Sequence, residues 1–243
     1  MKRTFIRSIS SLFIMLLFLT ACNAQKYGRI KGNGNVVTKT RNVGNFDKIG
    51  VSGSFDVTLI KGNEGEIKIK IEDNLLPYLE TIVEGGKLKL KWKKGTNIST
   101  TKGVYLTVYF KDINAVSLSG SGEIISKDMI KSDNFDLAVA GSGDIDLNVD
   151  TKNLIAAISG SGDIEVNGSA DKFTASISGS GDIESFGLNS KKANIKISGS
   201  GDMEINVSEE LFARVSGSGD IKYKGNPRKE DIKVSGSGEI SSY

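Results

Sequence analysis

The chain has 243 residues and a formal net charge of +3, with 32 Lys and Arg residues against 29 Asp and Glu residues. Lys2, Arg3 and Arg7 supply the whole excess, so the remainder is neutral and nucleic-acid binding is not expected. The lack of histidine and the single cysteine exclude histidine general bases, Ser-His-Asp triads, histidine-ligated metals and disulfide bonds within the chain.

Residues 1–21 have the pattern of a secretory signal peptide, because three basic residues precede an apolar run that is too short to be a stable membrane span. Leu19-Thr20-Ala21-Cys22 resembles a bacterial lipobox. We expect cleavage before Cys22, acylation of its thiol and a short tether over 22–28. The alternative is an ordinary secretory signal with an incidental cysteine.

A lipid on Cys22 would anchor the protein to a membrane of the bacterial cell envelope. The next residue is Asn23 rather than the aspartate that can signal retention in the inner membrane. The expected location is therefore the outer membrane, on its periplasmic face or at the cell surface.

Residues 29–115 are expected to form a less regular N-terminal β region. Lysines alternate with apolar residues over 66–71 and 87–92, as in half-exposed strands, while 73–79 breaks the pattern with an expected helical turn. The segment 50–57 resembles an early copy of the repeat described below. Since the end of a stacked β structure exposes strand edges, this region is expected to cap one end of the stack.

Trp92 stands among three lysines, at 91, 93 and 94. Such an aromatic residue suits two interpretations. It is either a platform on which a sugar ring stacks, or an aromatic side chain of the core or its rim.

Residues 116–243 repeat one short phrase seven times, built on an apolar residue, Ser-Gly-Ser-Gly (Ala-Gly-Ser-Gly in the second copy), an acid and usually Ile. The copies are spaced by 21, 19, 19, 20, 18 and 19 residues. A nearly constant period of this size indicates an all-β fold, a β-solenoid or β-helix-like stack with about 19–20 residues per coil. The acids that end the phrases are Glu123, Asp144, Asp163, Asp182, Asp202, Asp220 and Glu239.

Within each repeat the apolar residues alternate with polar ones, as at Phe135, Leu137 and Val139. Period-two alternation places them on one inward face, so we expect two strands per coil on either side of a glycine-rich corner. Two glycines in the phrase allow the chain to bend sharply at that corner.

Stacked coils lie about 4.8 Å apart, so neighbouring acids would repel by roughly 3.5 kcal/mol at an effective dielectric near 20. These seven stacked acids, called the acid ladder below, must therefore be solvated, hydrogen-bonded or bridged by cations. The favoured interpretation is that these acids stabilise the turns. The alternatives are a calcium site, since repeated Gly and Asp resemble calcium-binding β-rolls, and a glycosidase pair, against which the near-equivalence of the acids argues. No other cofactor is indicated.

A basic strip is also expected beside the acids. The outward position two residues before the first Ser is small in the early coils but becomes Lys196, Arg214 and Lys233 in the later ones. Charge pairing across coils is the favoured explanation, and a site for an anionic glycan is the alternative.

Further motifs occur in order before the repeat: Gly-Asn-Gly-Asn-Val at 32–36, Phe-Asp-Lys-Ile at 46–49, Glu-Asp-Asn-Leu-Leu at 72–76 and Gly-Lys-Leu at 86–88. With the repeat, they resemble the bacterial family called putative auto-transporter adhesin, head GIN domain (DUF2807), over 43–221. The resemblance implies a secreted or envelope-attached β-helical domain with a role in adhesion and no accepted catalytic residues. The chain leaves no room for a translocator barrel, so we expect transport by lipoprotein machinery instead.

Two classes of function follow. The favoured one is a non-enzymatic cell-envelope lipoprotein, an adhesin-like binding module that presents a polar face to an unknown protein, a glycan or a second copy. The alternative is a glycan-binding or carbohydrate-active β-helix protein. The final coil ends soon after Glu239 with little capping, which favours a homo-oligomer.

Overall fold

The computed structural model describes residues 28–243, so the signal peptide, Cys22 and most of the tether lie outside the described residues. Residues 28–243 contain no helix of the length and hydrophobicity needed to cross a membrane. The first strands are β1 (Arg29–Lys31), β2 (Val36–Asn42), β3 (Lys48–Ser52), β4 (Asp56–Lys61), β5 (Glu66–Glu72), β6 (Leu79–Glu84), β7 (Lys87–Trp92), β8 (Asn97–Ser99) and β9 (Tyr105–Phe110). The later ones are β10 (Ala115–Gly120), β11 (Glu123–Gly141), β12 (Asp144–Gly160), β13 (Ile164–Gly179), β14 (Ile183–Gly199), β15 (Met203–Gly217), β16 (Ile221–Lys224), β17 (Lys229–Gly236) and β18 (Ile240–Ser242).

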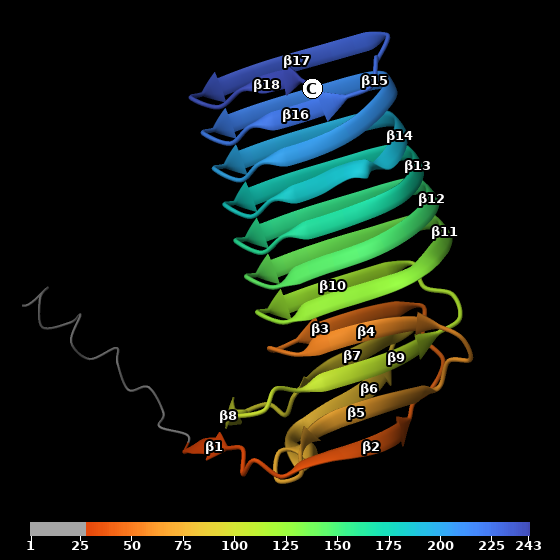
Figure 1. Ribbon diagram of the computed structural model, residues 1–243, viewed down its shortest axis with the longest axis vertical. Helices are drawn as coiled ribbons and strands as arrows, with labels where there is room; N and C mark the ends of the chain where they lie inside the picture. Colours follow the sequence, from red (N-terminus) through yellow and green to blue (C-terminus); the bar gives the residue numbers. More distant parts are fainter. Residues whose placement is uncertain (1–27) are drawn as a thin grey trace, which may run out of the picture.

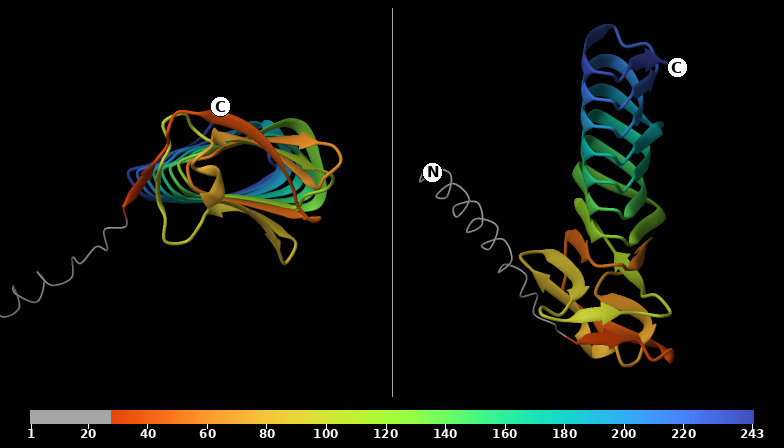
Figure 2. Two further views of the ribbon diagram at one scale, coloured as in Figure 1. Left: turned by 90° about the horizontal axis from the view of Figure 1, so that it is seen from below. Right: turned by 90° about the vertical axis from the view of Figure 1, so that its left-hand side faces the viewer.

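The repeat forms a β-solenoid, as expected. Strands β10 to β18 stack through parallel pairing that keeps its register apart from local bulges, and Figure 1 shows them as one column. Viewed along the column, the coils enclose a flattened tube (Figure 2). Each copy of the phrase occupies the same corner of its coil, so the corners lie directly above one another.

Each coil from β11 to β15 is one long strand rather than the two strands expected from the sequence. The strand leaves one Ser-Gly-Ser-Gly corner, crosses a face, bends round the opposite edge and returns to the next corner. The bend keeps the parallel ladder nearly continuous, since β12 and β13 remain paired from Ile145 to Gly160 with only one position missing. The repeat spacing predicts the coil, but it does not reveal that the second edge bends without breaking the strand.

The core consists of columns of identical or similar apolar residues between the two faces. The alternation predicted from the sequence is confirmed, because Phe135, Leu137 and Val139 and their counterparts in the next coils are buried. The column that follows the acids is equally closed, with Ile145, Ile164 and similar residues fully buried. Burial of such side chains stabilises a fold by about 1.5–3 kcal/mol each.

The N-terminal region continues the stack and then closes it. Strands β3 and β4 stack on β10 and β11 in parallel register, so the segment 50–57 occupies a coil position, as its resemblance to the repeat suggests. Below them β7 pairs with β3 and then antiparallel with β6, while β9 pairs with β4 and then antiparallel with β5. Strand β2 pairs antiparallel with β5. The change from parallel to antiparallel pairing ends the solenoid at this cap.

The expected interruption after β5 is a 3-10 helix, η1 (Leu76–Tyr78), with Pro77 in its first turn. It leads the chain into β6. Carbonyl groups of this helix and of the residue after it accept hydrogen bonds from a side chain on β2. The guanidinium of Arg41 on β2 donates to the carbonyl oxygens of Leu76 and Leu79, at 2.8 and 2.6 Å. Burial lowers the pKa of Arg41.

A buried carboxylate, Glu72, joins two of the sequence motifs in the cap. Its side chain accepts hydrogen bonds from the Gly34 amide at 2.7 Å, the Thr100 hydroxyl at 2.9 Å, and the amide and hydroxyl of Thr101 at 2.8 and 2.7 Å. A Cβ at Gly32 would lie 2.1 Å from Glu72 Oε2, so a side chain there would displace the Glu72 carboxylate from its hydrogen bonds. The Gly-Asn-Gly-Asn segment therefore packs on the Glu-Asp-Asn segment.

The neighbouring Asp73 extends this contact to the surface. Its carboxylate accepts hydrogen bonds from the side-chain amides of Asn33 and Asn35, at 2.7 and 2.6 Å, and these two bonds lower the pKa of Asp73. Both asparagines of the first motif are thus used in the contact.

Burial by itself would raise the pKa of Glu72, but the hydrogen bonds from Thr101, Gly34 and Thr100 outweigh it and lower the pKa from 4.5 to about 2. A depressed pKa means that the folded protein favours the ionised carboxylate. The stability that Glu72 contributes is therefore complete above about pH 4.5 and is lost as the pH falls towards 2.

We predict that Glu72→Ala lowers the free energy of unfolding by roughly 3 kcal/mol, because it leaves several buried donors without an acceptor. Urea denaturation at pH 7 measures this, with Glu66→Ala on the exposed side of the same strand as control. Between pH 4.5 and 2, the free energy of unfolding should also fall less for the variant than for the wild type. An unchanged unfolding free energy would contradict a structural role for this carboxylate.

Candidate functional site

The repeat corner brings the backbones of adjacent coils into direct contact. Gly160, with a φ of +139°, adopts a conformation that L side chains rarely take, and a Cβ there would lie 2.2 Å from the Gly141 carbonyl oxygen. The second glycine of the same phrase, Gly162, would place a Cβ 2.1 Å from the Gly143 oxygen. Between them the Ser161 amide donates to Gly141 at 2.8 Å. The glycines are required for the stacking distance as well as for the bend.

The acid ladder is a chain of hydrogen bonds from coil to coil. In each case the Oδ1 atom of an aspartate accepts a bond from the backbone amide of the acid in the next coil, at 2.7 to 3.0 Å. The accepting residues are Asp144, Asp163, Asp182, Asp202 and Asp220. Of the three states expected for the ladder, the structure contains the hydrogen-bonded one.

The two glutamates of the ladder stand at its ends. In the coil after Glu123, the corresponding amide is that of Asp144. It donates a hydrogen bond to the Gly122 carbonyl oxygen at 3.0 Å instead of to the Glu123 side chain. Glu239 ends the series and donates its own amide to Asp220. Aspartate thus occurs wherever the carboxylate accepts a hydrogen bond from the next coil, and glutamate occurs where it does not.

This arrangement bears on the two alternatives for the acids. The five aspartates share one geometry, and no two of them form a pair in distinct environments such as an acid and a base require. Across residues 28–243, no three acidic side chains converge in a group that could hold a metal ion. The ladder has the geometry of a structural series of hydrogen bonds that joins each coil to the next.

A second acid column, which the sequence reasoning missed, runs beside the ladder. The outward residues two positions after the ladder acids stack in register, and most are acidic: Asp146, Glu165, Glu184 and Glu204, followed by Lys222. Glu184, Glu204 and Lys222 line a small cavity of about 150 Å³ together with the later ladder acids. The recurrent Asp-Ile-Glu within the phrase was the signal for this column.

Crowding in this second column changes the proton affinity of its members. Glu184 and Asp146 are exposed, but their carboxylates lose part of their solvent. This desolvation and the charges of Glu165, Glu204 and the adjacent ladder acids raise the pKa of Glu184. Desolvation and Glu165 likewise raise the pKa of Asp146, and Lys127 offsets part of this effect. The two acid columns together make this side of the solenoid strongly negative.

The basic strip forms on the other face, near the end of the column. The guanidinium of Arg214 stacks on the Phe212 ring at 3.8 Å and pairs with the Asp231 carboxylate at 2.8 Å. It also donates to the Asp231 carbonyl at 2.6 Å. Arg214 therefore attaches β17 to β15, which is the charge pairing across coils that the sequence favoured.

Trp92 lies at the rim of the core. It is partly buried against the core cluster and meets Phe55 edge to face, with the ring centroids 5.0 Å apart. This position matches the second of the two interpretations, an aromatic of the core or its rim.

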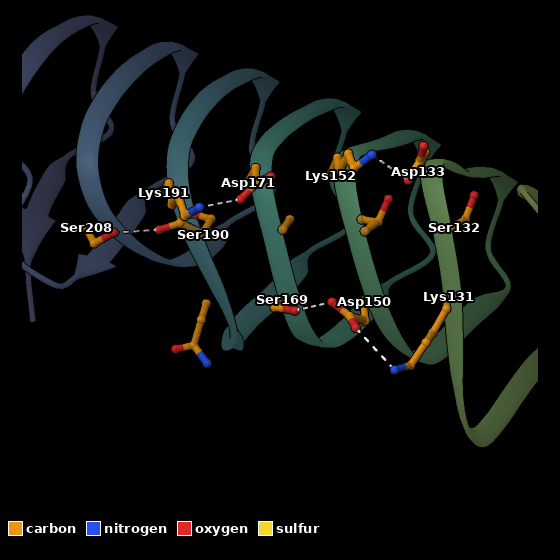
Figure 3. A pocket seen from close by; sticks show the side chains of 13 residues that line it. Lys131, Ser132, Asp133, Asp150, Lys152, Ser169, Asp171, Ser190, Lys191 and Ser208 are labelled. Carbon is orange, nitrogen blue, oxygen red and sulfur yellow. Dashed lines mark hydrogen bonds and ion pairs between the residues drawn. The ribbon is translucent and has the colours of Figure 1, made fainter.

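The edge opposite the repeat corner carries a groove of about 670 Å³, which runs across several coils (Figure 3). Hydroxyl and small side chains form its floor, and Thr151, Ala170 and Ser190 among them are buried. Figure 3 shows a row of charged and polar side chains on each side, with Lys152, Asp171 and Lys191 in one row and Lys131 and Asp150 in the other.

Charges of opposite sign alternate along this groove. Lys152 pairs with Asp133 at 3.0 Å, and Lys191 pairs with Asp171 at 2.7 Å. In the other row Asp150 contacts Lys131 at 3.6 Å and accepts a hydrogen bond from Ser169 at 2.7 Å. Stacking therefore brings opposite charges together at this edge, whereas it brings like charges together in the acid columns.

Comparison with known proteins gives one family and several solved structures. The family model described as "Putative auto-transporter adhesin, head GIN domain" (DUF2807) matches residues 45–227. No curated protein matches the chain.

The fold is similar to that of a "putative adhesin" from Bacteroides fragilis, with a TM-score of 0.82 at 24% identity, covering 88% of this chain and 100% of that one. A "putative lipid binding protein" from Parabacteroides distasonis gives a TM-score of 0.74 at 29% identity, with 89% and 100% covered. A "putative adhesin" from Parabacteroides merdae gives 0.69 at 25% identity, with 88% and 99% covered. The match to the first of these concerns the fold alone.

We predict that Glu184→Gln stabilises the protein at pH 7 and raises its melting temperature by roughly 1–3 °C. A raised pKa means that the folded protein disfavours the ionised form, so stability is lost as the pH rises through that pKa. Removing the charge should recover this loss, and the gain should vanish at acid pH, where Glu184 is already neutral. Glu209→Gln, at the opposite edge, is the control, and a lower melting temperature for Glu184→Gln would contradict the argument.

Proposed function

Since this chain belongs to the family of putative auto-transporter adhesins with a head GIN domain, we propose that it is a non-enzymatic, adhesin-like module of the bacterial cell envelope, held to the membrane by a lipid on Cys22. The β-solenoid presents repeated polar surfaces to a protein or glycan partner. The acids of the repeat hold the solenoid together rather than perform chemistry.

The single observation that carries this proposal is the use of the acid ladder. The repeat supplies the most prominent set of candidate catalytic or metal-binding side chains in the chain, and five of its acids accept a hydrogen bond from the next coil. A catalytic pair would need one carboxylate to differ in environment from its neighbour. A ladder of equivalent bonds serves stability and shape instead.

The position of the described N-terminus supports a lipid anchor. Strand β1 begins at Arg29, seven residues after Cys22, and lies at the cap end of the column (Figure 1). A lipid on Cys22 would hold the cap near the membrane, and the repeat coils would extend roughly 30 Å away from it. In that orientation the far end of the column would point away from the membrane, towards a partner.

A glycan ligand is the second candidate, and the groove at the edge opposite the corner is the observation that favours it. Its side chains repeat from coil to coil with the coil spacing, about 4.8 Å, and offer hydroxyl, carboxylate and ammonium groups in two rows. A polymer with a short repeat, lying along the column, would meet similar groups at each step. This candidate is a binding function and leaves the acid ladder in its structural role.

We predict that Cys22→Ser abolishes lipidation and releases the protein from the membrane. Cells grown with a clickable palmitate analogue would report the lipid, and fractionation would report the location. The wild type should carry the label in the membrane fraction, and the variant should lose it. A labelled Cys22→Ser protein would show that the lipid is attached elsewhere.

We predict that replacing Asp163 and Asp182 by alanine lowers the free energy of unfolding by about 1–3 kcal/mol, whereas the matched double replacement by asparagine leaves it nearly unchanged. Each asparagine keeps the oxygen that accepts the bond from the next coil, but it removes the carboxylate. The asparagine variant is thus folded but has no acid at these positions.

The same pair of variants separates the functions. A structural ladder predicts that the asparagine variant binds calcium and glycans as the wild type does in calorimetric titrations. A calcium response or a glycan-cleaving activity that the wild type has and the asparagine variant lacks would overturn the non-enzymatic proposal.

A further inference from the structure

The end of the solenoid away from the cap has an open edge. Within residues 28–243, β17 pairs only with β15, and β18 pairs only with β16. Figure 1 shows both strands at the far end of the column from β1. The outer side of each strand therefore presents backbone N–H and C=O groups to a partner.

The apolar core is also exposed at this end. Ile232 and Val234 continue the inward columns of Ala213 and Val215, but each is 37% exposed, whereas the two residues beneath them are at most 2% exposed. At the cap, by contrast, Ile67, Ile69 and Ile71 are fully buried. Among residues 28–243, the core residues are thus partly open at this end and closed over at the cap.

The sequence of β17 is complementary to itself when two copies run antiparallel. If Ile232 lies opposite Ile232 of a second copy, Asp231 lies opposite Lys233 on the outer face, and this pair occurs twice. The registers one residue to either side place Lys233 opposite Lys233 or Asp231 opposite Asp231. Opposite charges on facing strands stabilise a pair, and like charges destabilise it. The charges therefore favour the register centred on Ile232.

We propose that the open end is a self-recognition surface, at which two copies of this chain pair their β17 strands antiparallel about a two-fold axis through Ile232. Such an axis, perpendicular to the faces of the solenoid, keeps the inward side chains of both copies on the core side. The contact is the same on both partners, so it closes after two copies and gives a dimer rather than a fibre. In the part of the chain that the structure describes, the capped end has no matching edge with an open core.

The direction of the two columns determines how the dimer lies relative to the membrane. This consequence rests on the lipid anchor of the proposed function. The two caps lie at opposite ends of the dimer, so two anchored copies would have to stand on facing membranes. Pairing at the tips would then join two surfaces carrying the same protein. The pairing itself does not require the lipid.

Glu230 limits the strength of this contact. It occupies an inward position at the start of β17, accepts a hydrogen bond from the Tyr223 hydroxyl at 3.3 Å, and would lie opposite Val234 of the second copy. Inward charges at an edge are a known device against permanent edge pairing. The dimer is therefore reversible, and Glu230→Gln should lower its dissociation constant.

Disulfide cross-linking of the full chain in detergent tests the register. Cys22 is replaced by serine so that the introduced cysteine is the only thiol. Ile232→Cys should give a covalent dimer under mild oxidation, since directly opposite Cβ atoms lie about 4.5–5.5 Å apart. Val234→Cys is the matched control: it is equally exposed, but its two copies would lie about 14 Å apart along the strands.

Efficient cross-linking of the first variant and not of the second supports the proposal. Equal cross-linking of both would mean random collision, and its absence from both at high protein concentration would mean no pairing, so either result overturns it. Lys233→Asp should also raise the dissociation constant at least tenfold, because it sets aspartates opposite each other. Lys196→Asp, in the same outward column two coils earlier, should have no effect.

Vesicles carrying the lipidated wild-type protein test the consequence and separate the two proposals. They should aggregate with one another, and vesicles carrying Lys233→Asp should not. If Cys22 is not lipidated, cross-linking at Ile232 persists while the vesicles carry no protein. If the pairing is wrong, the vesicles carry protein but neither aggregate nor yield the covalent dimer.

Discussion

The close approach of backbones at the repeat corner is the constraint on which the rest of the structure depends. A Cβ at Gly162 would come within 2.1 Å of the Gly143 oxygen, so any side chain there would push the coils apart. With glycine in place, the Ser161 amide reaches the coil below, and the residues of β12 and β13 align with their counterparts along almost the whole strand. The apolar columns of the core form because the corner sets the register from which they are counted.

The same alignment that stacks apolar residues also stacks charges, and the molecule meets this problem differently at three places. At the corner, each aspartate uses its charge to hold an amide of the next coil. At the opposite edge, the sign alternates, so stacking brings Lys191 against Asp171. In the second acid column, desolvation and the repulsion between neighbouring carboxylates together raise the pKa of Glu184, so the ionised form is disfavoured there. Stacking is therefore stabilised at two of these places and opposed at the third.

Much of the fold was predictable from the sequence because one physical rule applies in every coil. The repeat spacing and the period-two alternation together predicted the solenoid and its buried columns, and the acid ladder was expected from the register alone. The state of the ladder was not predictable, since the hydrogen bond that the Asp182 amide donates to the Asp163 carboxylate depends on sub-ångström geometry. The Glu72 network was also missed, because its partners come from segments far apart in the chain and follow no period.

A stack of this kind has unequal ends for a thermodynamic reason. Each coil is stabilised mainly by its two neighbours, so a terminal coil lacks half of the contacts that hold an inner one. At the first end the antiparallel strands and the Glu72 contacts replace the missing neighbour. At the other end, β17 is held by its pairing with β15 and by the ion pair between Arg214 and Asp231. A second copy would supply the missing neighbour there, so order in the last coil and association of two chains are coupled, and each promotes the other.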